Sequence, residues 1–343
     1  MQVRDMLRSV NARRATSWGL AALLVLAACA APLARSDDLQ TIRLICLPNV
    51  PLPVVIGTRN GIFAKYGIAV QAAKAVDAAA LRSALADGSA DAAHAAVENA
   101  VTMVDSSQAD VVIVVGGESS TSELIVQPEI NSVKDLRGHI IITDGPDTAY
   151  TLTLKQILLR NGLQPDKDCE FKVVGLAPQR LEAMKENKQY AATIEKPPTS
   201  VLAQRAGLVS LGLTQTLLGT APSQGIGGFV RRDWARDHAE LLERYVAAFI
   251  EAQRWLLAPA NKEQVVQMLT KDSHLLSDIA ADTYDVDMKN AWTPDARFQP
   301  DGFAEVLNLR TAAGDTKPAS GRPANSYYDL SYYDKALALV NAK

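Results

Sequence analysis

From residue 40 onward, short apolar runs alternate with longer segments whose apolar positions recur at helical spacing. The short runs predict β-strands and the longer segments predict amphipathic helices. Near the start of the chain, the predicted strands cover residues 41–47, 68–72, 90–96 and 111–115, and the predicted helices cover residues 54–65, 78–86 and 99–105. The run at 111–115 is apolar throughout, which predicts a strand buried on both faces and ended by the glycines at 116 and 117. Alternating strands and helices predict βαβ units in a layered α/β fold.

A second series of the same kind begins near residue 129. Its predicted strands cover residues 139–143, 170–174 and 190–194, and its predicted helices include 148–160 and 178–186. Asp147 is expected to cap the first of these helices. From residue 225 the pattern changes to one glycine-rich strand and then a mainly helical tail. The predicted helices of that tail cover residues 237–257, 262–269, 277–288, 302–312 and 331–340.

The first 29 residues have the pattern of an export signal. Four arginines precede an uncharged stretch whose apolar centre covers residues 18–28, as in secretory signal peptides. A membrane-spanning helix is the alternative, but the run is rich in alanine and short for a span. Residues 26–29 read LAAC and resemble a bacterial lipobox, so we expect Cys29 to be lipidated and residues 30–39 to form a tether. Cleavage after Ala30 is the other possibility.

Composition and motifs narrow the class of function. The net charge is −3 and aromatic residues make up 6% of the chain, which argues against nucleic-acid binding. The three cysteines lack Cys-x-x-Cys spacing, so Cys46 and Cys169 are expected to be buried and unpaired. The four histidines lack ligand spacing, and His94 is expected to be a core residue, with a role in a cleft as the alternative. The nucleophile, phosphate-loop and zinc motifs are missing, so we expect no catalytic residue, metal or cofactor.

Several short motifs occur in an order that points to one family. Residues 61–68 read GIFAKYGI, residues 84–91 read ALADGSAD, and residues 132–138 read SVKDLRG. They are followed by NGL at 161–163 and RRDW at 231–234. This series resembles the bacterial ABC-transporter substrate-binding proteins for sulfonates, taurine, nitrate and thiamine pyrimidines. The resemblance covers about residues 40–340.

The resemblance implies a type II periplasmic-binding-protein fold, in which two α/β lobes are joined by two hinge crossings and enclose a ligand cleft. Residues 40–128 and 224–343 would form lobe 1, and residues 129–223 would form lobe 2. The chain would be a monomeric solute-binding component in the periplasm or at the cell surface, attached to the membrane only through the lipid on Cys29. It would deliver a small sulfonate-, pyrimidine- or amine-like solute to an ABC permease in the inner membrane. A pyrimidine-synthase-like enzyme and an exported ligand-sensing module are the alternatives.

Ligands of open α/β sheets bind beyond the carboxyl ends of strands, close to helix N-termini. The residues expected to bind ligand on this ground are Asn49, Glu98, Asn99, Gly117, Glu118, Ser119, Asp144, Thr148, Tyr150, Glu195 and Lys196. Free N–H groups at helix starts favour an anion, yet acids crowd these loops and Lys196 is the one cation in the set. Capping of helices is the alternative role for these acids. If several of them face the cleft, a neutral or nitrogenous ligand fits better than nitrate.

Overall fold

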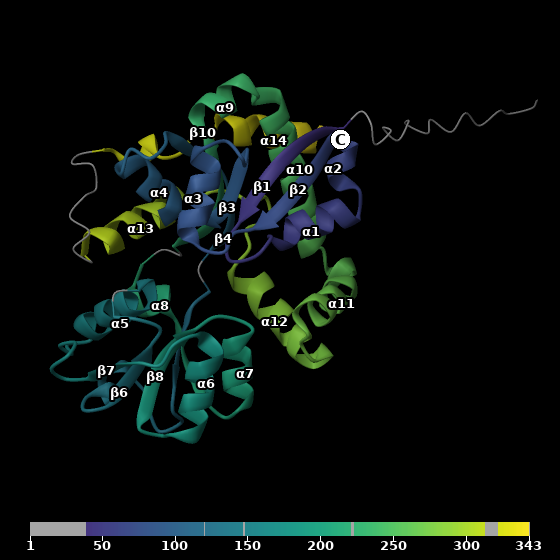
Figure 1. Ribbon diagram of the computed structural model, residues 1–343. Coiled ribbons are helices and arrows are strands. Elements are labelled where there is room, and N and C mark those ends of the chain that lie inside the picture. Colours follow the sequence, from purple (N-terminus) through teal and green to yellow (C-terminus); the bar gives the residue numbers. More distant parts are fainter. Residues whose placement is uncertain (1–38, 120, 147, 221–222, 313–321, 343) are drawn as a thin grey trace, which may run out of the picture. The chain divides into compact units, whose positions relative to one another are not determined.

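The computed structural model describes residues 39–342 apart from 120, 147, 221–222 and 313–321 (Figure 1). The predicted signal, Cys29, the tether up to residue 38 and the predicted cap Asp147 lie outside the described residues. The described chain forms two five-stranded sheets, each with its own helices. None of the described helices combines the length and apolar character that a membrane span requires.

The first sheet has the strand order β2-β1-β3-β10-β4. Strand β1 is parallel to β2 and β3, whereas β10 is antiparallel to its neighbours β3 and β4. The strands are β1 (Gln40–Cys46), β2 (Ile68–Lys74), β3 (Ala92–Ala96), β4 (Val111–Ser119) and β10 (Gln224–Arg231). The helices between them are α1 (Leu52–Arg59), α2 (Ile62–Lys65), α3 (Ala78–Ala86) and α4 (Glu98–Asp105). The predicted βαβ pattern is therefore confirmed in this part of the chain.

Glycines account for two differences from the predicted elements. The predicted helix 54–65 is two helices, because Gly61 adopts the left-handed conformation with φ +68° between α1 and α2. The prediction that the glycines at 116 and 117 end the strand is wrong, since β4 continues to Ser119. A Cβ atom on Gly116 would lie 2.6 Å from the backbone oxygen of Arg297. This glycine permits the close approach of another segment and does not terminate the strand.

The second sheet has the order β7-β6-β8-β5-β9, and its parallel and antiparallel pairs follow the same pattern as in the first sheet. Strand β6 is parallel to β7 and β8, and β5 is antiparallel to β8 and β9. The strands are β5 (Glu123–Val126), β6 (Ile140–Thr143), β7 (Glu170–Val173), β8 (Tyr190–Glu195) and β9 (Val209–Leu213). The helices are the 3-10 turn η2 (Val133–Leu136), α5 (Ala149–Arg160), α6 (Ala177–Glu186), α7 (Thr199–Arg205) and α8 (Thr214–Leu218).

Two connections join the sheets. The chain leaves the first sheet between β4 and β5 and returns to it between α8 and β10. Strand β5 pairs with β8 and β9 and so belongs to the second sheet. The second sheet therefore begins before residue 128, at which the boundary between the lobes was predicted. Strand β9 and helix α8 were not predicted, because β9 is short, is interrupted by Gly212 and is only partly buried.

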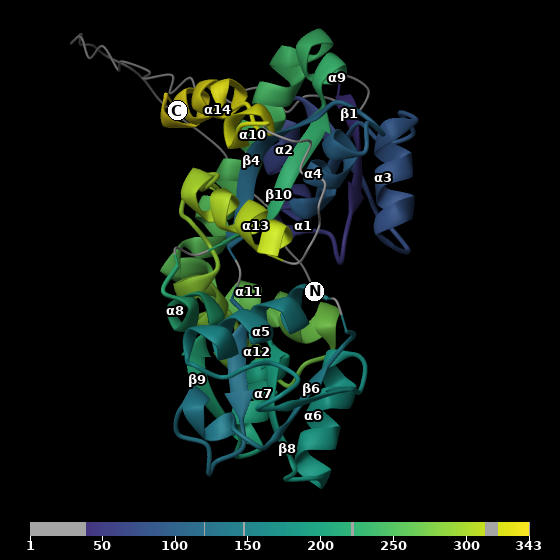
Figure 2. The ribbon, with the colours of Figure 1, turned by 90° about the vertical axis from the view of Figure 1, so that its left-hand side faces the viewer.

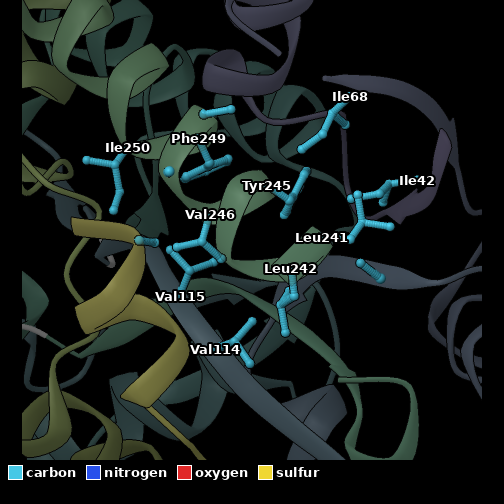
Figure 3. Close-up of a cluster of buried hydrophobic side chains, with 14 of the residues drawn as sticks. Ile42, Ile68, Val114, Val115, Leu241, Leu242, Tyr245, Val246, Phe249 and Ile250 are labelled. Carbon is cyan, nitrogen blue, oxygen red and sulfur yellow. The ribbon is translucent and has the colours of Figure 1, made fainter. Parts of the chain in front are cut away.

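The helical tail packs on the first sheet and contributes a large part of its core. Its elements are α9 (Arg232–Asp237), α10 (Ala239–Leu257), η3 (Pro259–Asn261), α11 (Lys262–Ser273), α12 (Ser277–Asn290), α13 (Pro300–Ala312), η4 (Ala324–Ser326) and α14 (Ser331–Asn341). Helix α10 turns one apolar face toward β4, and Figure 3 shows Leu242 and Val246 of α10 close to Val114 and Val115. Figure 2 shows α13 beside β10. The predicted single helix 237–257 begins as α10 at Ala239, because His238 leaves helical geometry after α9.

Candidate functional site

Two neighbouring cavities lie beside the loops of the first sheet, and one of them is also lined by residues that belong to the second sheet and its helices. One has a volume of about 470 Å³ and a wall rich in charged and hydroxyl groups, and we call it the polar cavity. The other has a volume of about 580 Å³ and a mainly hydrophobic wall, and we call it the apolar cavity. The two share the wall residues Pro48, Asn49, Glu118, Ile226 and Asp287. Both volumes are in the range of small-molecule binding sites.

Carboxylates surround a single ammonium group in the polar cavity. Glu118 lies near the end of β4, Glu98 begins α4, and Asp287 projects from α12. Lys196 follows β8 of the second sheet and is the one lysine or arginine among the described lining residues. The site therefore draws charged groups from the strand ends of both sheets and from the helical tail.

Burial determines the protonation of these groups. Burial raises the pKa of the Glu98 and Glu118 carboxyls, and the Lys196 charge only partly opposes this effect. Burial also raises the pKa of Asp287, and Glu118 adds to the increase, so that it reaches about 7. Burial lowers the pKa of Lys196, but the nearby Tyr150 and the carboxylates outweigh it and the net change is upward. At neutral pH the Lys196 ammonium is charged, and Asp287, with a pKa of about 7, retains part of its protons.

Glu98 also has an unsatisfied acceptor. Its Oε2 atom is buried and has no hydrogen-bond partner among the described residues. A buried carboxylate oxygen without a donor is costly, and the cost is removed when a ligand supplies an N–H or O–H group. Glu98 Oε2 is thus an acceptor that the polar cavity offers to a ligand.

His94 lies at the wall of the apolar cavity and is a buried histidine, as predicted. Its Nε2 atom is hydrogen-bonded to the hydroxyl of Tyr245 at 3.0 Å, and its ring centroid is 4.8 Å from that of Phe249. Burial lowers the pKa of His94 to about 3, so the ring is neutral. The buried Nδ1 of His94 and Nε1 of Trp292 have no hydrogen-bond partner among the described residues. The apolar cavity therefore has two ring nitrogens in its wall that have no hydrogen-bond partner among the described residues.

Six of the residues expected to bind ligand line these cavities, and five do not. The six are Asn49, Glu98, Gly117, Glu118, Tyr150 and Lys196. The five are Asn99, Ser119, Asp144, Thr148 and Glu195, and each of them is engaged by protein groups.

Asp144 and Thr148 form the N-terminal cap of α5. The Thr148 hydroxyl accepts a hydrogen bond from the Thr151 amide at 3.2 Å and donates one to Asp144 Oδ1 at 2.6 Å. The cap is therefore Thr148, one residue after the predicted Asp147. This pair has the capping role that was the alternative for acids in these loops.

The other three residues are held within the protein. Asn99 Oδ1 accepts from Arg82 at 2.9 Å, and Ser119 Oγ accepts from Gln299 at 3.0 Å. Glu195 is fully buried and forms an ion pair with Arg180 at 3.0 Å. Burial raises the pKa of Glu195 to about 7, although Arg180 opposes the change.

Sequence reasoning missed the contribution of the helical tail. Asp287 on α12 and Trp292 just after it line the apolar cavity, and Asp287 also faces the polar one. Ligand-binding residues were expected at strand ends and helix starts, whereas Asp287 and Trp292 lie late in a helix and in the following loop. A tryptophan two residues before Pro294 in an otherwise polar stretch was the available signal.

Comparisons with known proteins agree with this architecture. The family model of the NMT1-like family matches residues 46–270. The nitrate/nitrite binding protein NrtA of Synechocystis is 27% identical over 128 residues, which is 37% of this chain and 28% of that protein. The match thus spans little more than a quarter of that relative.

Solved structures of periplasmic binding proteins have the same fold. A putative sulfonate-binding protein SsuA from Methylobacillus flagellatus superposes with a TM-score of 0.70 at 20% identity, covering 89% of this chain and 96% of that one. The nitrate-binding protein NrtA from Synechocystis gives 0.65 at 16% identity, covering 89% and 90%. The predicted two-lobed periplasmic-binding-protein fold is confirmed, and the chain belongs to the NMT1-like family.

Proposed function

We propose that this chain is the solute-binding component of an ABC importer, which closes on a small organic molecule and delivers it to a membrane permease. Membership of the NMT1-like family and the likeness to proteins named for sulfonate and nitrate binding support this function. A polar cavity walled by both sheets also supports it, because closure of the sheets around a ligand would enclose that cavity. The two connections between the sheets are the proposed hinge.

The charges of the polar cavity favour a nitrogenous solute over a sulfonate or nitrate. The observation that carries this choice is the group of buried carboxyls, Glu98, Glu118 and Asp287, around Lys196. Attraction between a bound cation and these carboxyls is strong in such a buried setting. A sulfonate or nitrate ligand would instead be repelled, because the carboxyls outnumber Lys196. An amine or an aminopyrimidine supplies an N–H group of the kind that Glu98 Oε2 lacks among the described residues.

The proposed location is outside the cytoplasm, with Cys29 as the lipid anchor. The support for it is the arginine-rich start, the apolar run and the LAAC motif of the sequence. Mass spectrometry of the protein recovered from cell membranes tests the anchor, because a diacylglyceryl group on an N-terminal Cys29 is expected. A mature chain that begins after Ala30 would exclude it.

A thermal-shift panel tests the function and the ligand class together. The panel contains amines, aminopyrimidines, alkanesulfonates and nitrate, and a ligand at 100 times its Kd stabilises a protein by about 2.7 kcal/mol. We expect an upward shift with a nitrogenous compound, which Glu98→Gln and Glu118→Gln reduce. Glu129→Gln alters an exposed acid that lines neither cavity and is the matched control. A sulfonate or nitrate shift that survives both cavity variants contradicts the ligand class and leaves the receptor function intact.

A further inference from the structure

The shared wall of the two cavities contains two acids of the site. Glu118 and Asp287 line both the polar and the apolar cavity. A positively charged group held by these carboxyls would therefore stand at the junction, with polar surroundings on one side and apolar surroundings on the other. The part of the ligand that extends from this group toward the apolar side would then enter the apolar cavity.

The apolar cavity is suited to a hydrophobic body. Its wall contains side chains from α1, α10, α11 and the loops next to them: Val50, Leu52, Val55, Phe249, Leu269 and Trp292. Its volume of about 580 Å³ is far larger than an inorganic anion or methylamine requires. Transfer of apolar ligand surface from water to such a wall is favourable in proportion to the area buried.

Two of the side chains in this wall, Phe249 and Trp292, are aromatic. Phe249 and Trp292 present π faces or edges, which pack well against another ring and attract a nearby cation. The buried Trp292 Nε1, which has no partner among the described residues, provides an N–H donor at the same wall. An aromatic ring with a short amine-bearing arm matches this combination of groups.

We propose that the solute is an arylalkyl amine, whose ammonium group lies between Glu118 and Asp287 and whose ring occupies the apolar cavity beside Phe249 and Trp292. This inference rests on the proposed function and names its substrate class. In this proposal the apolar cavity holds the ring of the ligand, whereas the charged groups of the polar cavity explain only how the ammonium group binds.

Calorimetric titrations with phenethylamine and methylamine test the inference. Burial of a phenyl group predicts that phenethylamine binds at least about thirtyfold more tightly than methylamine. Val55→Phe and Leu269→Phe each add bulk to the apolar wall, so each is expected to weaken phenethylamine binding about tenfold and to leave methylamine nearly unaffected. Val70→Phe makes the same change at a half-buried site outside both cavities and is the control.

Tryptophan fluorescence reports where the ring binds. Phenethylamine should change the emission of Trp292, methylamine should not, and the Trp292→Phe variant should lose the change. Equal affinity for the two amines, or equal weakening of both by the wall variants, overturns the inference while the receptor function stands. Binding of sulfonates in place of both amines overturns the inference together with the proposed ligand class. A failure of the whole panel speaks against the receptor function itself.

Discussion

Arg205 of α7 forms ion pairs with Asp278 and Asp282 of α12, and its Nε lies 3.0 Å from Asp282 Oδ2. Helix α7 belongs to the second sheet, whereas α12 belongs to the tail that follows the return to the first sheet. The same α12 carries Asp287 into both cavities. These ion pairs therefore help to determine the position of Asp287 in the candidate site.

Loss of the Arg205 ion pairs should make local opening of α12 easier and change the global stability of the protein only slightly. Exposed ion pairs contribute little to global stability, so Arg205→Ala should leave the thermal midpoint nearly unchanged. Hydrogen exchange measured by mass spectrometry should show faster exchange in residues 277–290, because local opening of that helix becomes easier. Arg236→Ala removes an arginine whose ion pair is with its neighbour Asp237, and it is the control. Unchanged exchange in α12 would show that the ion pairs do not hold the helix.

Asp287→Asn should raise stability at alkaline pH. The native pKa of Asp287 is about 7, above the value of about 3.9 for an unfolded aspartate, so the native state binds the proton more tightly. The stability cost of ionising this residue is absent below about pH 4, builds up as the pH rises to about 7, and is constant above that. The variant avoids this cost, and a tenfold change in proton affinity corresponds to about 1.4 kcal/mol.

The measurement is the difference in unfolding free energy between Asp287→Asn and the parent protein from pH 4.5 to 8. We expect the variant to gain at least about 1.4 kcal/mol relative to the parent over this interval. Asp285→Asn changes an exposed carboxyl on the same helix and should give no comparable gain. A difference that stays constant with pH would mean that Asp287 is not buried with the other acids.

The Arg180–Glu195 ion pair should be a stability element and not a ligand contact. Arg180 also donates to Thr193 Oγ1 and to the backbone oxygens of Gly175 and Ile194, so its charge is fully enclosed. Glu195→Ala leaves that charge unpaired and should cost about 3–5 kcal/mol in urea unfolding. Lys185→Ala removes an exposed ion pair of the same helix and should change stability little. A small loss for Glu195→Ala, with weaker solute binding, would return Glu195 to the binding site.

His94→Gln should change the acid stability of the protein. The unfolded histidine takes up a proton below about pH 6.5, whereas the buried ring resists protonation down to about pH 3. The contribution of His94 is therefore full above pH 6.5 and decreases as the pH falls toward 3. The stability advantage of the parent protein over His94→Gln should shrink by up to about 2.7 kcal/mol between pH 7 and 4.5. An advantage that is independent of pH would mean that the native ring takes up its proton at the same pH as the unfolded histidine, which contradicts its burial.

The sequence carries enough local pattern to predict the sheets, but it predicts only part of the candidate site. Continuous or alternating apolar runs predicted most strands, because the interior of an α/β sheet requires them. Glu195 and Lys196 show that the role of a residue can depend on distant parts of the chain. They are adjacent, yet Glu195 pairs with Arg180 inside the protein, whereas Lys196 faces the polar cavity. Strand register and the position of Arg180 decide this difference. Asp287 could not be predicted, because tertiary packing decides which helix of the tail reaches the cavities.

The most direct test of the account is the proton balance of solute binding. The tightest nitrogenous ligand of the panel is titrated calorimetrically at pH 7 in two buffers with different heats of ionisation. Asp287, with a pKa of about 7, holds part of its protons at pH 7, and burial also raises the pKa values of Glu98 and Glu118. A bound cation should displace protons from this group. We expect net proton release and an affinity that increases from pH 5 to 8. Proton uptake, or binding that tightens as the pH falls, would contradict this expectation and indicate an anionic solute.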